Sequence, residues 1–319
     1  HRDLHSFPTR RSSDLFSNQN ITLSGELRLP LGLGPFPLLV VLHPASNPLR
    51  GHPFYRHLAH GIPAHDMAVF LFDRRGSGDS EGNFDTASFE DLAGDALAAA
   101  RCLAAHPQID PHAIGLYGIS QGGWLAPLAA AQDPLIHFLV IVSGCGVSPA
   151  EQMNYAARWT LENAAFPQPA IDTALGLRRA VDDYYRGLLT HAETTNRLKR
   201  YAHDSWYPQA YLPDPERLPL DVRSSKWFYQ FSYDPLPVWQ RVTQPSLFLF
   251  AESDRWVPVD ESLRRYQQAT SHIPNVRFEV IQGTNHMMED LTQGTEDGSG
   301  VISTVYQQTL TDWLTEVVN

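Results

Sequence analysis

The pentapeptide Gly-Ile-Ser-Gln-Gly at residues 118–122 constrains the fold of this chain more than any other feature. It follows an apolar run, residues 113–117, and opens an alanine-rich stretch, residues 121–131. A serine with a glycine two residues before it and another two residues after it, placed between a buried strand and a helix, is typical of a sharp turn that exposes the serine hydroxyl. The backbone N–H of Gln121 would then point to where an oxyanion forms. The pattern predicts Ser120 as a nucleophile at the carboxyl end of a strand.

Short continuous apolar runs recur along the rest of the chain. Runs of this kind suit a parallel sheet that is covered on both faces. We expect such strands at residues 38–42, 68–72, 114–117, 138–142, 247–250 and 276–281, and an alternating edge strand at 21–29. Helical spacing appears between them at residues 88–105, 121–131, 260–269 and 301–318. The alternation predicts a doubly wound, mostly parallel α/β domain.

Two later loops supply the partners that a nucleophilic serine needs. Each loop follows a predicted strand, at the edge where open α/β sheets carry their sites. The first loop holds Asp254, with Glu252 and Asp260 as alternative acids, and the second holds His286. The expected roles are Ser120 as nucleophile, His286 as general base and acid, and Asp254 as the carboxylate that orients the imidazole.

A second oxyanion donor is expected in the loop after the strand at residues 38–42. Pro44 has no N–H, so the donor is Ala45 or Ser46. We favour Ala45 as the partner of the Gln121 N–H.

With these motifs in place, the chain resembles the α/β-hydrolase superfamily from about residue 21 onward. Residues 72–80, Phe-Asp-Arg-Arg-Gly-Ser-Gly-Asp-Ser, are similar to the family's Asp-x-Arg-Gly-x-Gly-x-Ser loop. Residues 120–127 resemble the bacterial branch near the prolyl-oligopeptidase-like and dienelactone-hydrolase-like esterases. Residues 251–258 keep the acid loop Gly-x-x-Asp-x-x-Val-Pro apart from its glycine, and residues 43–44 are His-Pro where the family usually has His-Gly. The resemblance implies an α/β-hydrolase fold with a Ser–Asp–His triad.

A long segment, residues 147–241, separates two strands that a short crossover would otherwise join. In α/β-hydrolases an insertion at this place is commonly a helical cap, which leaves residues 16–146 and 242–319 as the core. The segment is dense in aromatic residues, which favours an apolar or aromatic substrate group. From the whole chain, the residues expected to contact the substrate are His43, Trp124, Trp206, Trp227 and Trp256.

Residues 1–15 stand apart from the rest of the sequence. They look like a translated sequencing-adaptor read fused to a fragmentary gene, as found in environmental sequence assemblies, and the chain begins without Met. We expect a non-native leader and a missing native N-terminus, with a genuine disordered basic tail as the alternative. Neither reads as a signal peptide, and the compartment, cytoplasmic or exported, stays open.

Composition narrows the classes of partner. A net charge of −11 argues against nucleic acid or an anionic membrane surface, and no apolar run approaches the roughly 18 residues of a membrane span. The two cysteines are too few for a disulfide framework. Four histidines at positions 52, 57, 60 and 65 lack the acidic or cysteine partners of a metal site, so we expect no metal.

The sequence thus predicts a serine hydrolase that cleaves small-molecule carboxylic esters through an acyl-enzyme, without a metal or an organic cofactor. The first alternative is a serine peptidase or amidase of the prolyl-oligopeptidase-like type. The second is a non-catalytic binding protein on the same fold, whose Ser120 a fluorophosphonate would fail to label. The oligomeric state stays open.

Overall fold

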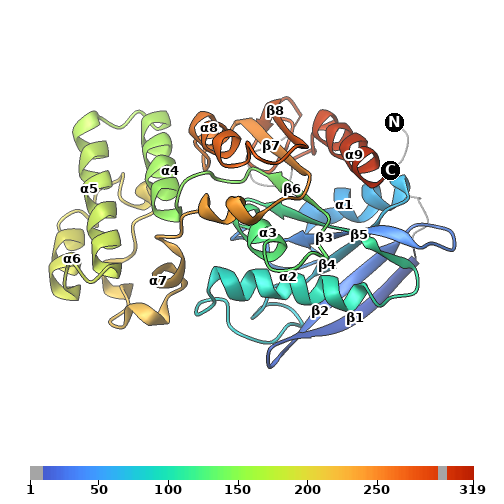
Figure 1. The fold of residues 1–319 in the computed structure, drawn as a ribbon. Helices are drawn as coiled ribbons and strands as arrows, with labels where there is room; N and C mark the ends of the chain where they lie inside the picture. The colour runs from blue at the N-terminus through green and yellow to red at the C-terminus, as the bar shows by residue number, and fades with distance from the viewer. Residues whose placement is uncertain (1–9, 294–299) are drawn as a thin grey trace.

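An eight-stranded sheet forms the centre of the molecule (Figure 1). The computed structural model describes residues 10–293 and 300–319. The strands, in chain order, are β1 (Arg10–Asn18), β2 (Ile21–Leu29), β3 (Phe36–Leu42), β4 (Ala68–Phe72), β5 (Ile109–Ile119), β6 (Phe138–Val142), β7 (Ser246–Ser253) and β8 (Val276–Asn285). They lie in the order β1-β2-β4-β3-β5-β6-β7-β8, with β1 and β4 antiparallel to β2 and the remaining pairs parallel. The doubly wound, mostly parallel α/β sheet expected from the sequence is confirmed.

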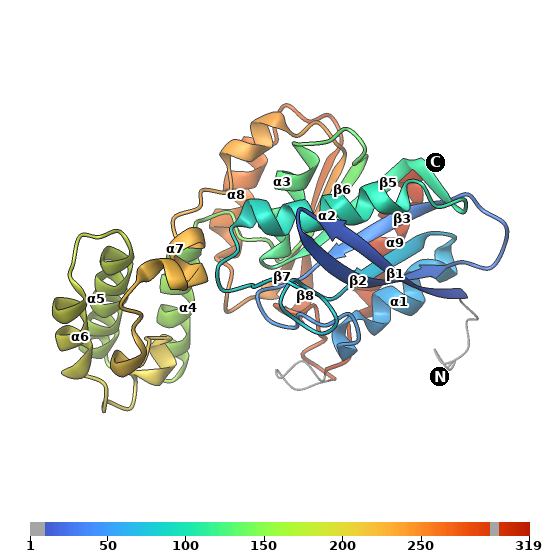
Figure 2. The same cartoon turned by 90° about the horizontal axis from the view of Figure 1, so that it is seen from below.

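Helices cover both faces of this sheet, as Figures 1 and 2 show from two directions. The core helices are α1 (Arg56–Gly61), α2 (Phe89–Leu103), α3 (Gly122–Ala130), α8 (Val259–Ala269) and α9 (Thr304–Val318). Short 3-10 helices lie at Pro53–Tyr55, Ile62–His65, Pro208–Ala210, Pro215–Arg217, Val222–Ser224 and Pro237–Arg241. Alternate residues of β3 enter two separate apolar clusters: Val40 belongs to the cluster that includes residues of α2, α3 and α8, and Val41 to the one that includes residues of α1 and α9. Period-two alternation in a strand that is buried on both faces produces this two-sided core.

The sheet extends further toward the N-terminus than the sequence indicates. β1 pairs with β2 along its whole length, from Arg10 opposite Leu29 to Asn18 opposite Ile21. The expectation that residues 21–29 form the edge of the sheet is therefore wrong, because β1 covers their outer side. β1 begins inside the segment expected to be a leader, whose residues 1–9 lie outside the described residues. The proposed non-native origin of residues 1–15 stays a prediction.

Residues 147–241 lie between β6 and β7 and contain four α helices. These are α4 (Pro149–Asn163), α5 (Gln168–Tyr185), α6 (His191–Lys199) and α7 (Lys226–Gln230). Figure 2 shows α5 and α6 standing away from the sheet, with α4 and α7 between them and the core. Leu161, Ile171 and Leu198 belong to an apolar cluster of this segment's own. Over the described ranges, no helix combines the length and apolarity needed to cross a membrane.

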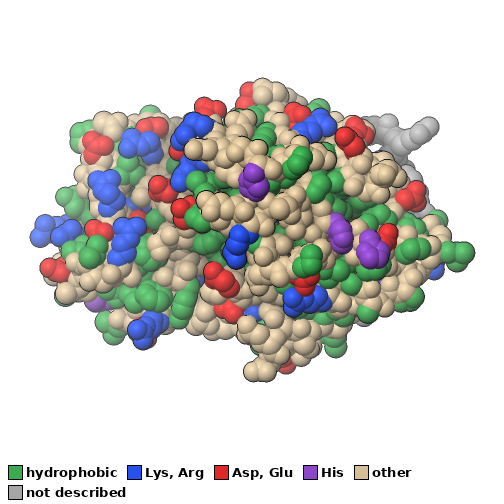
Figure 3. Space-filling view, in the orientation of Figure 1, with side chains coloured by type: hydrophobic (Ala, Val, Ile, Leu, Met, Phe, Trp, Pro, Cys, Tyr) green, Lys and Arg blue, Asp and Glu red, His purple; other side chains and the backbone are tan. Residues whose placement is uncertain are grey.

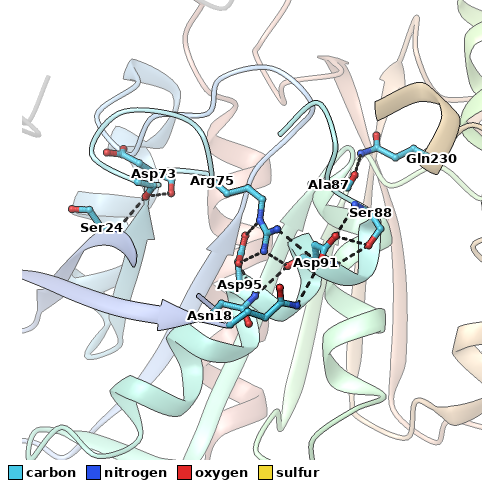
Figure 4. A network of polar contacts seen from close by, with 11 residues as sticks. Asn18, Ser24, Asp73, Arg75, Ala87, Ser88, Asp91, Asp95 and Gln230 are labelled. Atoms are coloured by element: carbon cyan, nitrogen blue, oxygen red, sulfur yellow. Dashed lines mark hydrogen bonds and ion pairs between the residues drawn. The ribbon is translucent and has the colours of Figure 1, made fainter. Parts of the chain in front are cut away.

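A buried polar network ties the loop after β4 to β1 and α2 (Figure 4). The Arg75 guanidinium donates two hydrogen bonds of 2.7 Å to the Asp95 carboxylate of α2. The Asn18 side-chain amide, from β1, donates to the same carboxylate at 2.7 Å. The Arg75 and Asp95 side chains are 9% and 2% exposed, so this charge pair is shielded from solvent. The contacts fix the path of residues 73–88, which carry Ala87 toward the site described below.

This network gives a first prediction. Replacing Arg75 by Met leaves the Asp95 carboxylate buried without its cation, which should lower the free energy of unfolding by about 3 kcal/mol. Urea denaturation would measure the change. The double variant Arg75→Met/Asp95→Leu is the control, because it removes both charges, and it should recover at least half of the loss. Equal stability of the wild type and the Arg75→Met variant would contradict the assignment.

Candidate active site

The turn between β5 and α3 holds Ser120 in a left-handed backbone conformation, with φ of 54°. Such a conformation is rare outside glycine and is found where the surroundings enforce it. At this turn β5 and α3 leave no room for side chains: a Cβ on Gly118 would lie 2.1 Å from the Gly122 carbonyl oxygen, and one on Gly122 would lie 2.7 Å from that of Leu42. The Ser120 N–H donates to the Val142 carbonyl at 2.9 Å, which anchors the turn to β6. The two glycines are therefore required by the close backbone approach.

Ser120 opens on a cavity of about 540 Å³. Loops at the carboxyl ends of the strands form one side of the cavity, and residues of α4 and α7 form the other. The lining from the core includes Pro44, Ala45, Ser46, Asn47, Gln121, Trp124, Ser253, Arg255, Trp256, Asn285, His286 and Met287. The lining from the long insertion is Pro149, Gln152, Met153, Trp159, Lys226, Trp227 and Gln230. The volume of the cavity is in the range found for small-molecule binding sites.

Asp254 and His286 meet directly beside this cavity. His286 Nδ1 lies 2.9 Å from Asp254 Oδ1 and 2.8 Å from Oδ2. A carboxylate only accepts hydrogen bonds, so Nδ1 carries the proton and Nε2 is the basic nitrogen of the neutral ring. Of the other two acids considered, Glu252 accepts from the Gly283 N–H and Asp260 lies exposed in the first turn of α8. The structure therefore pairs His286 with Asp254.

The loops that carry this pair are held by groups the sequence analysis did not identify. Asp254 Oδ1 also accepts from the N–H groups of Trp256 and Val257, at 2.8 and 3.0 Å. On the other loop, the Ser143 hydroxyl donates to the His286 carbonyl at 2.8 Å. Ser143 directly follows β6 at the same edge of the sheet, and this position is the signal that could have found it. Asp254 is thus held by N–H groups of its own loop, and the His286 backbone is held by Ser143 from the loop after β6.

The two expected oxyanion donors, Gln121 and Ala45, both line the cavity near Ser120. The Ala45 loop is held by Arg74, whose Nη1 donates to the carbonyls of Pro44 and Ala45 at 3.1 and 2.9 Å. Arg74 occupies the variable position of the Asp-x-Arg motif, so the Ala45 loop is held by a residue of the turn after β4.

The Gln121 side chain is tied to the long insertion. Its Nε2 donates to Gln230 Oε1 of α7 at 3.2 Å. Gln230 Nε2 in turn donates to the Ala87 carbonyl at 3.1 Å, a contact drawn in Figure 4. Because a carbonyl can only accept, the Ala87 contact fixes the orientation of both amides. The residue after the serine is thereby anchored to α7.

Three of the five predicted substrate contacts, Trp124, Trp227 and Trp256, line the cavity. His43 and Trp206 do not, and their placement corrects the expectation. His43 Nε2 lies 2.6 Å from the Phe72 carbonyl, and the ring is buried against the rings of Phe72 and Tyr55. Trp206 is buried in the insertion's own apolar cluster, against Tyr201 and Tyr207. Both side chains are buried in the protein interior and do not face the cavity.

The histidines near α1 also take structural positions. His57 Nδ1 lies 2.6 Å from the Phe54 carbonyl, and its Nε2 lies 3.3 Å from the Tyr306 hydroxyl. His52 Nδ1 accepts from the Phe54 N–H at 3.2 Å. In the part of the chain that the structure describes, no three His, Cys, Asp or Glu side chains gather as a metal site requires.

Comparison with known proteins agrees with this architecture. The sequence model of the alpha/beta hydrolase family matches residues 39–294, which is most of the chain. The chain therefore belongs to the alpha/beta hydrolase family.

Solved structures share the fold at low sequence identity. An esterase of Pyrococcus furiosus is 16% identical with a TM-score of 0.64, over 100% of this chain and 93% of that one. The alpha/beta hydrolase GrgF of Penicillium is 20% identical with a TM-score of 0.60, over 96% and 98%. The acylaminoacyl peptidase of Pyrococcus horikoshii is 15% identical with a TM-score of 0.55, over 88% of this chain and 38% of that one. A search among curated protein sequences gives no match.

Burial of His43 makes stability depend on pH. Burial lowers the pKa of His43 from 6.5 to about 3. Between these two pH values the unfolded state binds a proton on His43 and the folded state does not. The stability that this neutral ring contributes is complete above about pH 6.5 and is lost as the pH falls below it. Between about pH 8 and pH 5, wild-type protein should lose about 2 kcal/mol more unfolding free energy than the His43→Gln variant. Urea denaturation at both pH values tests this, and parallel losses in the two proteins would refute it.

Proposed function

We propose that this protein is a serine hydrolase that cleaves carboxylic esters through an acyl-enzyme intermediate. The observation that carries the proposal is the arrangement at the cavity. The Asp254–His286 pair and the strained serine turn come from separate loops, and Ser120 and His286 line the same hollow. A buried carboxylate that orients an imidazole, together with a half-buried serine on the same cavity, serves nucleophilic acyl transfer.

In the proposed reaction, His286 Nε2 takes the Ser120 proton as the oxygen attacks the ester carbonyl. Negative charge develops on the carbonyl oxygen, and the N–H groups of Gln121 and Ala45 stabilise it. His286 then protonates the leaving alcohol, and an acyl group remains on Ser120. Water, activated by the same imidazole, releases the acid and restores the serine. Asp254 holds the imidazole in the required tautomer and stabilises its cation at each step.

We further propose that residues 147–241 act as a cap over the core formed by residues 16–146 and 242–319. Support comes from the contacts of the insertion with the site itself. The Tyr155 hydroxyl of α4 donates to the Asp254 carbonyl at 3.2 Å, and the Tyr211 ring lies 5.0 Å from that of Trp256. A cap of this kind excludes water and shapes the substrate pocket. Its lining of Trp159, Trp227 and the core's Trp124, Trp256 and Met287 favours an apolar or aromatic ester.

An amide substrate is the second candidate, since one protein of the same fold is an acylaminoacyl peptidase. That fold is shared over 38% of the peptidase chain. We place esters first because an alcohol leaves more readily than an amine and requires less from the general acid. Turnover of aminoacyl-anilides without turnover of esters would reverse this order.

The nucleophile is tested by initial rates on 4-nitrophenyl esters of increasing chain length. Ser120→Ala should lower kcat/KM by at least about 1,000-fold, because the acyl-enzyme cannot form. His286→Ala should cause a loss of similar size. A fluorophosphonate should label the wild-type protein and leave the Ser120→Ala variant unlabelled. Full activity of the Ser120→Ala variant would overturn the proposal.

The anchor between the insertion and the serine turn gives a separate prediction. Gln230→Leu removes the partner of the Gln121 side chain, so the oxyanion donor beside Ser120 is held less firmly. We expect kcat to fall about tenfold with a smaller change in KM, as for a contact that matters in the transition state. Gln168→Leu, which removes an exposed amide of α5, is the matched control. A change confined to KM would show that Gln230 contacts substrate and does not position the turn.

A further inference from the structure

We propose that the substrate of this site carries a carboxylate, and that Lys226 and Arg255 bind it. The inference rests on the proposed esterase function and specifies its substrate class. It starts from the charges in the cavity wall: Lys226 and Arg255 line the cavity, and no Asp or Glu does so within the described ranges. Asp254, the acid nearest in sequence to Arg255, is 3% exposed and is bonded to His286.

This wall contrasts with the rest of the molecule. The chain has a net charge of −11, with 35 acidic and 24 basic residues. Figure 3 shows acidic and basic side chains interspersed over the visible face, so cations there have anions close by. A cavity lined by cations alone, in an acidic protein, marks a site that favours an anion.

Lys226 is the more constrained of the two cations. It is half-buried at the start of α7, and among the described residues it has no carboxylate within salt-bridge distance. Its Nζ lies 4.3 Å from the Phe84 ring centroid, and the Arg74 guanidinium lies 3.5 Å from the same centroid. Burial, and after it the charge of Arg74, lowers the pKa of Lys226, while Asp85 opposes the shift.

The surroundings of Lys226 therefore compensate its charge poorly. An aromatic face offsets part of the lost hydration of an ammonium group, but it accepts no conventional hydrogen bond. Arg74 is committed to the carbonyls of Pro44 and Ala45. A ligand carboxylate beside Lys226 would supply the missing acceptor and opposite charge.

Arg255 brings the second cation from the core side of the cavity. It lies in the loop between Asp254 and Trp256, and its guanidinium carbon is 5.4 Å from the Trp256 ring centroid. Lys226 belongs to the insertion, so the two cations enter the cavity from its two sides. Tryptophans line the same cavity, so the wall suits an ester that is apolar in part and anionic at one end.

The test compares charged and neutral esters of similar size. The neutral probe is 4-nitrophenyl butyrate. The mono-4-nitrophenyl ester of glutaric acid carries a carboxylate on the acyl side of the ester, and 4-(butyryloxy)benzoate carries one on the alcohol side. We expect one of the two anionic esters to exceed the neutral ester at least about tenfold in kcat/KM, the scale of one charge-assisted hydrogen bond. The better anionic ester identifies which side of the scissile bond carries the charge.

Charge variants then assign the residues. Lys226→Gln and Arg255→Gln should each reduce the preference for the anionic ester, and Lys226→Glu should reverse it. Arg223→Gln is the matched control, because Arg223 is an exposed cation of the same segment outside the cavity lining, and it should leave the preference unchanged. If the wild type hydrolyses the neutral ester as well as both anionic esters, and the variants leave that ratio unchanged, the carboxylate proposal is overturned while the esterase function stands.

A binding measurement separates the two proposals. Titration of the Ser120→Ala variant with each of the two anionic esters in a calorimeter should show that at least one of them binds, and that adding Lys226→Gln weakens this binding at least about tenfold. If no ester is hydrolysed by wild-type protein but this difference is seen, the esterase function fails and the anion site stands. Equal binding with and without Lys226 would overturn the anion site.

Discussion

The close approach of β5 to α3 at the serine turn is the constraint on which the rest of the site depends. Because the backbones at Gly118 and Gly122 almost touch, the chain reverses within one residue, and that residue takes the left-handed conformation. The reversal places the serine beyond the end of β5, with the start of α3 directly behind it. The strain at Ser120 is held by what surrounds it, including the bond from its N–H to β6 and the backbone of β3 against Gly122. A sheet that is buried on both faces supplies that rigidity.

The long insertion is joined to the core where the proposed chemistry is located. The Tyr155 hydroxyl donates to the Asp254 carbonyl, the Gln230 amide bonds to Gln121, and the Tyr211 ring lies against Trp256. Each contact reaches a loop that carries a proposed site residue or its neighbour. A displacement of α4 or α7 would therefore alter the cavity wall and the support of the serine turn together. This coupling gives the insertion a route to affect the rate of reaction as well as the choice of substrate.

The sequence predicted the parts of this molecule that depend on local pattern. The strands at residues 68–72 and 138–142 match β4 and β6 at both ends, because each is a continuous apolar run with a defined boundary. Asp254 and His286 meet in the structure because parallel strands bring the loops after them to one edge, and their catalytic roles stay predictions. β1 was missed because its mostly polar residues show no apolar alternation. Its strand conformation is stabilised by pairing with β2 along its whole length. His43 and Trp206 were misplaced because residue type indicates a capacity for binding, whereas burial decides whether a side chain faces a cavity.

The same limit explains why Lys226 and Gln230 have no signal in the sequence. They belong to a five-residue helix whose position over the site depends on packing across the whole insertion. Once in place, they act in a cavity walled by tryptophan and methionine, where charges interact more strongly than they do in water. In such surroundings the Asp254 carboxylate would offset the charge that forms on the His286 imidazole in the proposed reaction. The cations of the wall lack a comparable partner, and a substrate carboxylate is the group that would balance them.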